Sequence, residues 1–202
     1  HDSAVQNFHD EGEVAETYYD EMVALIKRLT GADEVRVFQH VVRTEDSTDF
    51  NKAYARFVHC DYSITDPHAN ATSAFERRDV PLDPSKNWEF AYYNTWQPIE
   101  REVQKNPLAM IDARSLDDGD VVDYYYTGFG EKVLTSMPVA STQHEFYYVS
   151  KMLPNESLVI KQLDTRPGRA VTCPHTSFDL EAPADALGRR SIEVRLMCAF
   201  AD

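Results

Sequence analysis

Residues 11–42 read EGEVAETYYDEMVALIKRLTGADEVRVFQHVV and place one long helix directly before a strand. The helix is predicted over residues 11–29, where apolar side chains recur at helical spacing and form one stripe. The members of this stripe are Val14, Tyr18, Met22, Leu25 and Ile26. Gly31 is a typical C-terminal cap, and the β-branched residues of the segment 35–42 predict a strand.

The rest of the chain consists mainly of short runs rich in β-branched and aromatic residues, which are typical of strands. Clusters of turn-forming residues such as DPHAN, MLPNES and TRPGR separate them. Further strands are predicted at 55–62, 88–96, 109–112, 121–126, 144–149, 157–163, 171–173 and 191–200. Residues 99–106 are predicted to form a second, short helix. This succession predicts a mainly β fold with flanking α structure, a jelly roll or barrel with a helix packed outside it.

Composition limits the classes of partner. With 202 residues, of which 43% are hydrophobic, the chain is expected to form one domain, residues 1–202. Acidic residues outnumber basic ones by 34 to 20 and give a net charge of -14, which disfavours nucleic acids and anionic membranes as partners. No apolar run approaches the roughly 20 residues of a membrane span, and the polar start is unlike a secretion signal. We therefore expect a cytoplasmic protein, for which a homodimer is compatible with the sequence.

The segment FVHCDYS, residues 57–63, carries the strongest chemical signal. In a strand His59 and Asp61 project from the same face, whereas Cys60 points away and is expected in the core. The later segment AVTCPHTSF supplies His175 at the end of another predicted strand. Two histidines and one carboxylate on one face are the typical ligands of non-haem iron(II). A histidine two residues from an aspartate is by itself a weak signal, since such a pair can be a structural hydrogen bond.

The terminal strand in GRRSIEVR separates polar from apolar side chains. Arg189 and Ser191 fall on one face with Glu193 and Arg195, while the opposite face is apolar. An arginine fork with a neighbouring hydroxyl can bind a carboxylate, so Arg189 or Arg195 is a candidate anchor for a dicarboxylic co-substrate. The alternative is a polar strand face on which Arg195 pairs with an acid.

Four further residues are candidates for the site. Asn94 could bind the co-substrate or a metal-bound water, or could satisfy the backbone of a loop. Trp96, Tyr126 and Tyr147 could line a pocket for an apolar small-molecule substrate, although packing in the core is the ordinary role of aromatic residues in strands.

Longer segments in this order resemble the CmcJ/NvfI-like oxygenases. The resemblance rests on GADEVRVFQHVVR, VHCDYS, YYNTWQPIEREVQKNPLAMIDARS, FYYVSKMLPNESLVIKQLDT, CPHTSF and RRSIEVR, and it spans nearly the whole chain. That family includes a fungal meroterpenoid endoperoxidase, a gibberellin desaturase and a protein associated with cephamycin methoxylation. Its members usually carry a further segment before the tyrosine-rich helix.

The resemblance implies a double-stranded β-helix, a cupin-like jelly roll over about residues 35–202, that uses iron(II), 2-oxoglutarate and dioxygen to oxidise a secondary metabolite. It assigns the metal to His59, Asp61 and His175, and the co-substrate anchor to Arg189 with Ser191. Hydroxylation, desaturation, cyclisation and endoperoxide formation are all outcomes within the family. Two alternatives stay open: an iron oxidase that needs no 2-oxoglutarate, and a non-catalytic cupin-type binding protein. A zinc hydrolase is disfavoured because no general base lies near the HxD pair.

Overall fold

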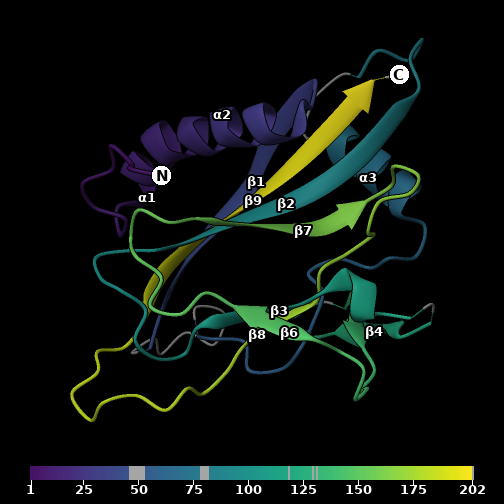
Figure 1. Cartoon of the computed structure of the whole chain (residues 1–202). Helices are drawn as coiled ribbons and strands as arrows, with labels where there is room; N and C mark the ends of the chain where they lie inside the picture. The colour runs from purple at the N-terminus through teal and green to yellow at the C-terminus, as the bar shows by residue number, and fades with distance from the viewer. Residues whose placement is uncertain (46–52, 78–81, 118, 129, 131, 202) are drawn as a thin grey trace.

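The larger of two facing sheets has the strand order β1-β9-β2-β7, with every neighbouring pair antiparallel (Figure 1). Its strands are β1 (Glu34–Thr44), β9 (Arg190–Ala201), β2 (Trp88–Pro98) and β7 (Leu158–Asp164). The computed structural model describes residues 1–45, 53–77, 82–117, 119–128, 130 and 132–201. In this strand order, β9, the last strand of the chain, lies in the middle of the sheet between β1 and β2.

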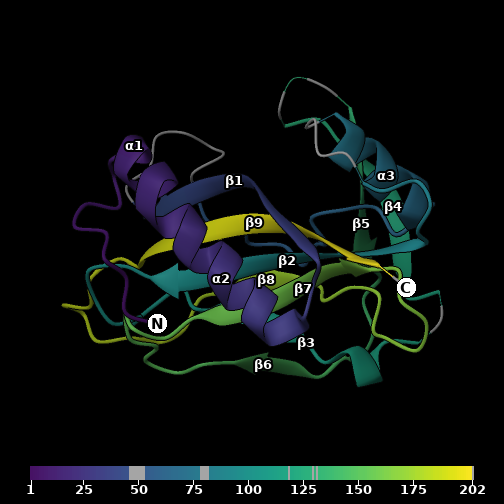
Figure 2. The ribbon, with the colours of Figure 1, turned by 90° about the horizontal axis from the view of Figure 1, so that it is seen from above.

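One helical segment crosses the outer face of the larger sheet (Figure 2). It consists of α1 (Glu11–Glu13), a π-helical turn (Val14–Tyr18) and α2 (Tyr19–Thr30). Asp10 caps its start, and Gly31 ends it with a φ of 72°, a conformation that costs glycine little. The predicted helix and its glycine cap are thus confirmed.

The smaller layer faces the inner side of the larger sheet (Figure 1). It contains a three-stranded sheet, in the order β6-β3-β8, and the hairpin β4-β5. Its strands are β3 (Leu108–Ile111), β4 (Val121–Tyr126), β5 (Val133–Pro138), β6 (Phe146–Tyr148) and β8 (His175–Ser177). A short 3₁₀ helix, Ala113–Ser115, follows β3, and the Asp112–Arg114 ion pair fixes this turn. Two facing β layers with a helix packed outside the larger one agree with the predicted jelly-roll fold.

The two faces of the larger sheet pack against different partners. On the outer face, alternate apolar residues of β9 pack with the buried side of the helix in one hydrophobic cluster. These β9 residues are Ile192, Val194, Leu196 and Cys198. On the inner face Phe90, Tyr92 and Met197 pack with helix α3 (Pro67–Glu76), and Trp96 packs with Leu108 of the smaller sheet. The alternation of side chains along β9 therefore separates a helix-packing face from an inner face.

Two predicted strands are wrong. Residues 55–62 form no ladder, and among the described residues this segment pairs with a strand only through the isolated bridge between His59 and His175. Its other backbone groups bond irregularly, as when the amide of Cys60 donates to the carbonyl of Ser136. The strand predicted at 171–173 instead begins at His175, after Pro174, which has no amide hydrogen to donate.

Two predictions about helices and turns also fail. Residues 99–106 form no helix, because Glu100 and Asn106 have φ values of 66° and 53°, outside the right-handed helical region. The segment DPHAN, predicted as a turn, opens helix α3, with Pro67 in the first turn where its missing N–H costs nothing.

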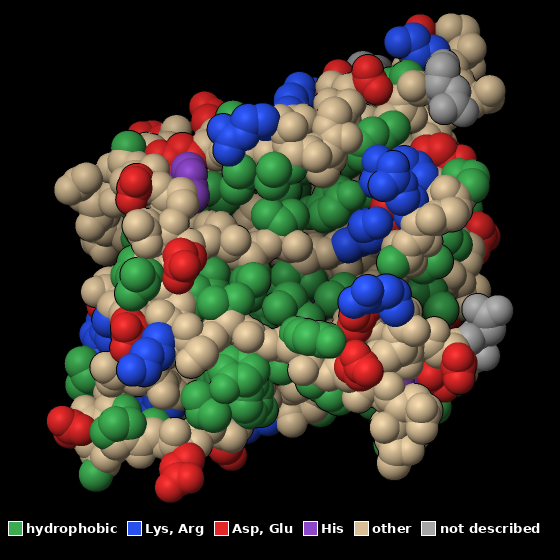
Figure 3. All heavy atoms as spheres, viewed as in Figure 1, with side chains coloured by type: hydrophobic (Ala, Val, Ile, Leu, Met, Phe, Trp, Pro, Cys, Tyr) green, Lys and Arg blue, Asp and Glu red, His purple; other side chains and the backbone are tan. Residues whose placement is uncertain are grey.

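The surface shows where polar and apolar side chains gather. On the face shown in Figure 3, hydrophobic side chains form a band between the helix and the smaller layer, and basic side chains cluster near the end of β7. There Lys161 and Arg166 both form ion pairs with Asp164. Within the described residues, no helix is long and apolar enough to cross a membrane.

Candidate metal centre

Three side chains that are far apart in the sequence converge between the two layers. His59 lies in the irregular segment after β1, His175 is the first residue of β8, and the backbone bridge between them brings their rings to a centroid distance of 4.6 Å. One ligand atom from each of His59, Asp61 and His175 lies within 4.8 Å of the other two. The structure thus brings together all three predicted metal-ligand candidates.

Hydrogen bonds to the backbone orient both imidazoles. The Nδ1 of His59 bonds to the carbonyl oxygen of Phe57 at 2.9 Å, and the Nδ1 of His175 bonds to that of Cys173 at 3.2 Å. A carbonyl oxygen only accepts, so each Nδ1 carries the proton and each Nε2 keeps a free lone pair. Metal-binding histidines are typically oriented in this way.

The charges at the site also suit a cation. Burial lowers the pKa of His59 to about 4, with a further contribution from His175, so this imidazole is neutral at pH 7. Burial alone would raise the pKa of Asp61, but the Arg195 guanidinium, the two histidines and a hydrogen bond from Asn94 hold it below its usual range. Neutral histidines and an ionised carboxylate are the forms that bind a divalent metal.

Arg195 and Asn94 contact Asp61. The Nδ2 of Asn94 donates to one carboxylate oxygen of Asp61 at 2.5 Å, and the Nη2 of Arg195 donates to the other at 3.3 Å. Arg195 also donates to Glu193 at 2.9 Å. The pairing of Arg195 with acids corresponds to the structural alternative that the sequence left open for this residue.

Arg189 and Ser191 occupy a different part of the interior. Arg189 is 2% exposed, and its guanidinium stacks on Tyr54 at 4.0 Å and lies 5.2 Å from the centre of the Trp96 ring. It donates to the carbonyl of Asn106 at 2.5 Å. The Nε of Arg189 and the hydroxyl of Ser191 are buried and, within the described residues, have no hydrogen-bond partner. A small cavity borders this guanidinium and the two histidines His59 and His175; it is lined by Arg43, Ala55, His59, Trp96, Leu108, His175, Ser177, Arg189 and Glu193.

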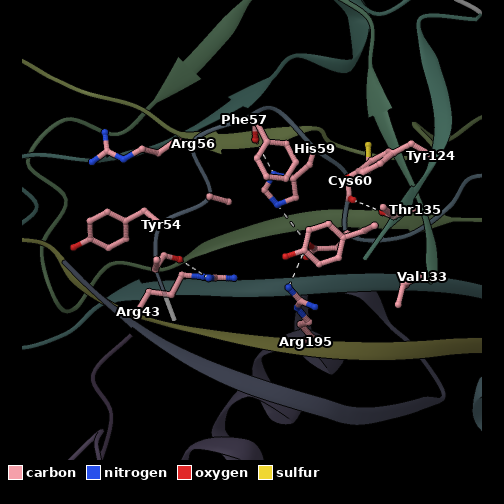
Figure 4. A pocket seen from close by; sticks show the side chains of 14 residues that line it. Arg43, Tyr54, Arg56, Phe57, His59, Cys60, Tyr124, Val133, Thr135 and Arg195 are labelled. Carbon is pink, nitrogen blue, oxygen red and sulfur yellow. Dashed lines mark hydrogen bonds and ion pairs between the residues drawn. The ribbon is translucent and has the colours of Figure 1, made fainter. Parts of the chain in front are cut away.

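A larger cavity of about 370 Å³ borders His59 and Asp61 (Figure 4). Most of its walls come from the segment 53–61 and from the β4-β5 hairpin. Its lining residues are Arg43, Ala53, Tyr54, Ala55, Arg56, Phe57, His59, Cys60, Asp61, Tyr124, Tyr126, Val133, Thr135 and Arg195. A mainly apolar cavity with a few polar groups at one end is typical of small-molecule sites.

The three predicted pocket residues lie in three different places. Tyr126 lines the larger cavity, Trp96 lines the smaller one and is 2% exposed, and Tyr147 lines neither. Tyr147 is 55% exposed on β6, where its hydroxyl donates to Glu145. Cys60 is buried, as expected, although it also borders the larger cavity.

Sequence reasoning missed three residues close to the site. Tyr54 stacks on Arg189, Arg43 borders both cavities, and the side-chain carbonyl of Gln162 is 3.5 Å from the backbone nitrogen of Asp61. The pairing of Arg43 with Ser191 across β1 and β9 places both at the same position along the sheet. The folding of the chain, and not a local motif, brings these residues to the site.

Two facing β layers with two histidines and one carboxylate between them define the class of non-haem iron oxygenases with a facial triad. Residues 1–199 match the family described as oxidoreductase/YMDC permease-like domain, and the chain belongs to this family.

Similar proteins of fungi include a hydroxylase/desaturase and a dioxygenase. The chain is 31% identical to the hydroxylase/desaturase efuI of Hormonema carpetanum, over 96% of this chain and 73% of that protein. It is 30% identical to the alpha-ketoglutarate-dependent dioxygenase tstK of Talaromyces stipitatus, over 99% of this chain and 76% of that protein. The solved structure of the iron and alpha-ketoglutarate-dependent endoperoxidase NvfI superimposes with a TM-score of 0.81 and 26% identity, over 96% of this chain and 72% of that one. The resemblance to iron- and 2-oxoglutarate-dependent oxygenases and the jelly-roll fold are thus confirmed.

Proposed function

We propose that this chain oxidises a small apolar metabolite with iron(II), 2-oxoglutarate and dioxygen, and releases succinate and carbon dioxide. The observation that carries the proposal is the convergence of His59, Asp61 and His175, of which His59 borders both cavities. The two imidazole Nε2 atoms and one carboxylate oxygen would hold iron(II) and leave its remaining positions open. When bound, iron(II) would activate dioxygen, which no protein side chain can do.

The buried groups beside the smaller cavity suit the co-substrate's carboxylate. Arg189 keeps its positive charge at neutral pH although burial lowers its pKa to about 10. Its Nε and the hydroxyl of Ser191 lack partners within the described residues, and leaving such buried groups unpaired costs stability. A carboxylate of 2-oxoglutarate would satisfy both, which supports Arg189 with Ser191 as its anchor.

The larger cavity fits the substrate. Phe57, Tyr124, Tyr126 and Val133 give it apolar walls next to the metal-ligand candidates. Such walls favour an apolar body, exclude water and orient one C–H bond towards the metal. Trp96 borders the smaller cavity instead, so we assign it to the surroundings of the co-substrate. The names of the relatives cover hydroxylation, desaturation and endoperoxide formation, so the class of product is left open.

The architecture supports one oxygenase domain over residues 1–202. Both layers contribute to the proposed site: His175 comes from the smaller layer, and Asn94 and Arg195 come from the larger sheet. A homodimer and a cytoplasmic location stay predictions from the sequence.

The test is 2-oxoglutarate turnover by the iron-loaded protein, measured as succinate formed and oxygen consumed. Wild type is expected to convert 2-oxoglutarate to succinate. In an Arg189→Gln variant the KM for 2-oxoglutarate should rise by roughly 100-fold, which is the effect of losing a hydrogen bond to a charged group. The matched control is Arg190→Gln, because the neighbouring Arg190 pairs with Glu100 at the partly exposed start of β9 and lines neither cavity.

Two results would overturn the proposal. Oxygen consumption without succinate would favour an iron oxidase that needs no 2-oxoglutarate. Binding of a small molecule without any oxygen consumption would favour a cupin-type binding protein.

A further inference from the structure

The carboxylate of Asp61 is surrounded by polar groups from three neighbouring strands of the larger sheet. Asn94 on β2 donates to its Oδ2 at 2.5 Å, and Arg195 on β9 donates to its Oδ1 at 3.3 Å. Gln162 on β7 contacts its backbone, with Oε1 3.5 Å from the Asp61 nitrogen. The side chain of Asp61 is only 5% exposed.

Strand register brings the three groups to one place. Asn94 and Arg195 are direct partners in the antiparallel ladder of β2 and β9, so their side chains leave the sheet on the same face. Between β2 and β7 the register jumps, because Tyr92 pairs with Leu163 whereas Tyr93 pairs with Lys161. Gln162 is therefore the extra residue of a bulge, a feature that commonly re-aims a side chain next to an active site.

The two oxygens of Asp61 have different surroundings. Oδ1 lies 3.6 Å from the Nε2 of His59, on the side where the histidines converge. Oδ2 accepts the hydrogen bond from Asn94. Oδ1 is therefore the oxygen next to His59, although it also accepts the longer bond of 3.3 Å from Arg195, whereas Oδ2 is held by the shorter bond from Asn94.

The polar groups are not explained by stability of the fold. The Oδ1 of Asn94 and the Nε2 of Gln162 are buried and, in the part of the chain that the structure describes, have no partner. Both residues are fully buried at 0% exposure. A buried amide that is only partly hydrogen-bonded costs stability relative to an apolar side chain of similar size. What the two amides contribute is their contact with Asp61.

We propose that Asn94, Gln162 and Arg195 are positioning residues that fix Asp61 as a ligand through one oxygen only. This inference rests on the proposed metal site and adds a role for three residues that do not touch the metal. Arg195 offsets the charge of two buried carboxylates, Asp61 and Glu193, Asn94 occupies Oδ2, and Gln162 fixes the backbone that carries Asp61.

The experiment measures binding of cobalt(II), a stable substitute for iron(II), by anaerobic calorimetric titration and by its visible absorption spectrum. An Asn94→Ala variant should raise the Kd for cobalt(II) by about 10- to 100-fold, the usual effect of losing an outer-shell partner. Its cobalt spectrum should change, because the freed oxygen can then bind the metal. The Tm of the metal-free protein is measured alongside, because loss of the bond to the buried Asp61 carboxylate can also lower stability.

Two further comparisons separate positioning from folding. Arg195→Lys should retain more of the wild-type cobalt affinity than Arg195→Met, because lysine keeps the positive charge beside Asp61. Gln162→Met, which keeps the length of the side chain without its amide, gives an independent result if Asn94→Ala does not fold. The matched control is Thr95→Val, because Thr95 is fully buried beside Asn94 and its hydroxyl also lacks a partner within the described residues. This control should bind cobalt as wild type does.

Two outcomes are decisive and distinct. In the first, Asn94→Ala and Gln162→Met keep the cobalt affinity and spectrum of wild type, while Asp61→Ala loses its affinity. This result would overturn the positioning roles and leave the proposed function intact. Undiminished affinity in Asp61→Ala would overturn the metal site itself, and the positioning roles with it.

Discussion

The two faces of β9 are both buried, yet they differ in chemistry. On the helix side, Ile192, Val194, Leu196 and Cys198 are all at most 1% exposed and belong to one hydrophobic cluster. On the inner side, Ser191 and Glu193 are also at most 4% exposed, but both are polar. Burial alone therefore does not identify a core position. A buried polar face reduces stability unless a ligand or partner satisfies it, so such a face indicates a binding site.

This comparison assigns stability to the helix side and ligand binding to the inner side. Substitutions on the helix side should lower the free energy of unfolding and leave ligand affinity in the folded protein unchanged. Substitutions of polar groups on the inner side, such as the Ser191 hydroxyl, should do the reverse, whereas Met197 on the same side belongs to the core beside α3.

The largest effect is expected from Asp61→Ala, which removes the carboxylate from the proposed metal site. Iron-dependent turnover should be abolished, and cobalt(II) affinity should fall by more than the roughly 100-fold that marks loss of an outer-shell partner. The protein should remain folded, as measured by circular dichroism. Near-normal turnover in this variant would refute the assignment of Asp61 as a ligand.

The next effect is expected on the helix side of the same strand. Leu196→Ala leaves a cavity beneath the helix and should lower the free energy of unfolding by about 2–5 kcal/mol. Chemical denaturation measures this change. The Kd for 2-oxoglutarate of the iron-loaded, folded variant should equal that of wild type, and a marked rise in that Kd would mean that the two faces are coupled.

A smaller effect is expected from Ser191→Ala on the inner side. Loss of one hydroxyl hydrogen bond should weaken 2-oxoglutarate binding by about 1 kcal/mol, or roughly fivefold. Because this hydroxyl has no partner within the described residues, stability without ligand should stay the same or rise slightly. If stability falls and affinity does not, Ser191 has a structural role instead.

The smallest effect is expected from Tyr147→Ala, which tests a residue that the sequence suggested for the substrate pocket. Its side chain is exposed and lines neither cavity. Stability should change by no more than about 0.5 kcal/mol, and turnover should be unchanged. Tyr126→Ala is the comparison, since Tyr126 borders the larger cavity and its loss should raise the KM for the substrate.

Periodicity was sufficient where an element keeps a regular alternation of apolar and polar side chains. The helix over residues 11–29 and the alternating strand that ends the chain are both correct, because each follows its structural repeat in the sequence. It failed for residues 55–62, where a single bridge to His175 replaces a ladder, and for α3, where a proline that opens a helix was interpreted as a turn.

The pair of His59 and Asp61 was predictable from local spacing, whereas its surroundings were not. His59 and Asp61 are two residues apart, so their proximity needs no knowledge of the fold. The contacts of Asp61 with Asn94 and Gln162 depend on strand order and on a one-residue shift between β2 and β7. Sequence periodicity does not encode such long-range register, which is why Asn94 and Arg195 were expected near the co-substrate.

The most direct test of the central claim is an anaerobic titration of the metal-free protein with iron(II) and then 2-oxoglutarate, followed by visible absorption. Bidentate binding of the 2-oxo acid to iron gives a metal-to-ligand charge-transfer band. The band is expected in wild type and should be absent in His59→Ala. If iron binds to wild type but no band develops, the proposed 2-oxoglutarate chemistry and the role of Arg189 are wrong.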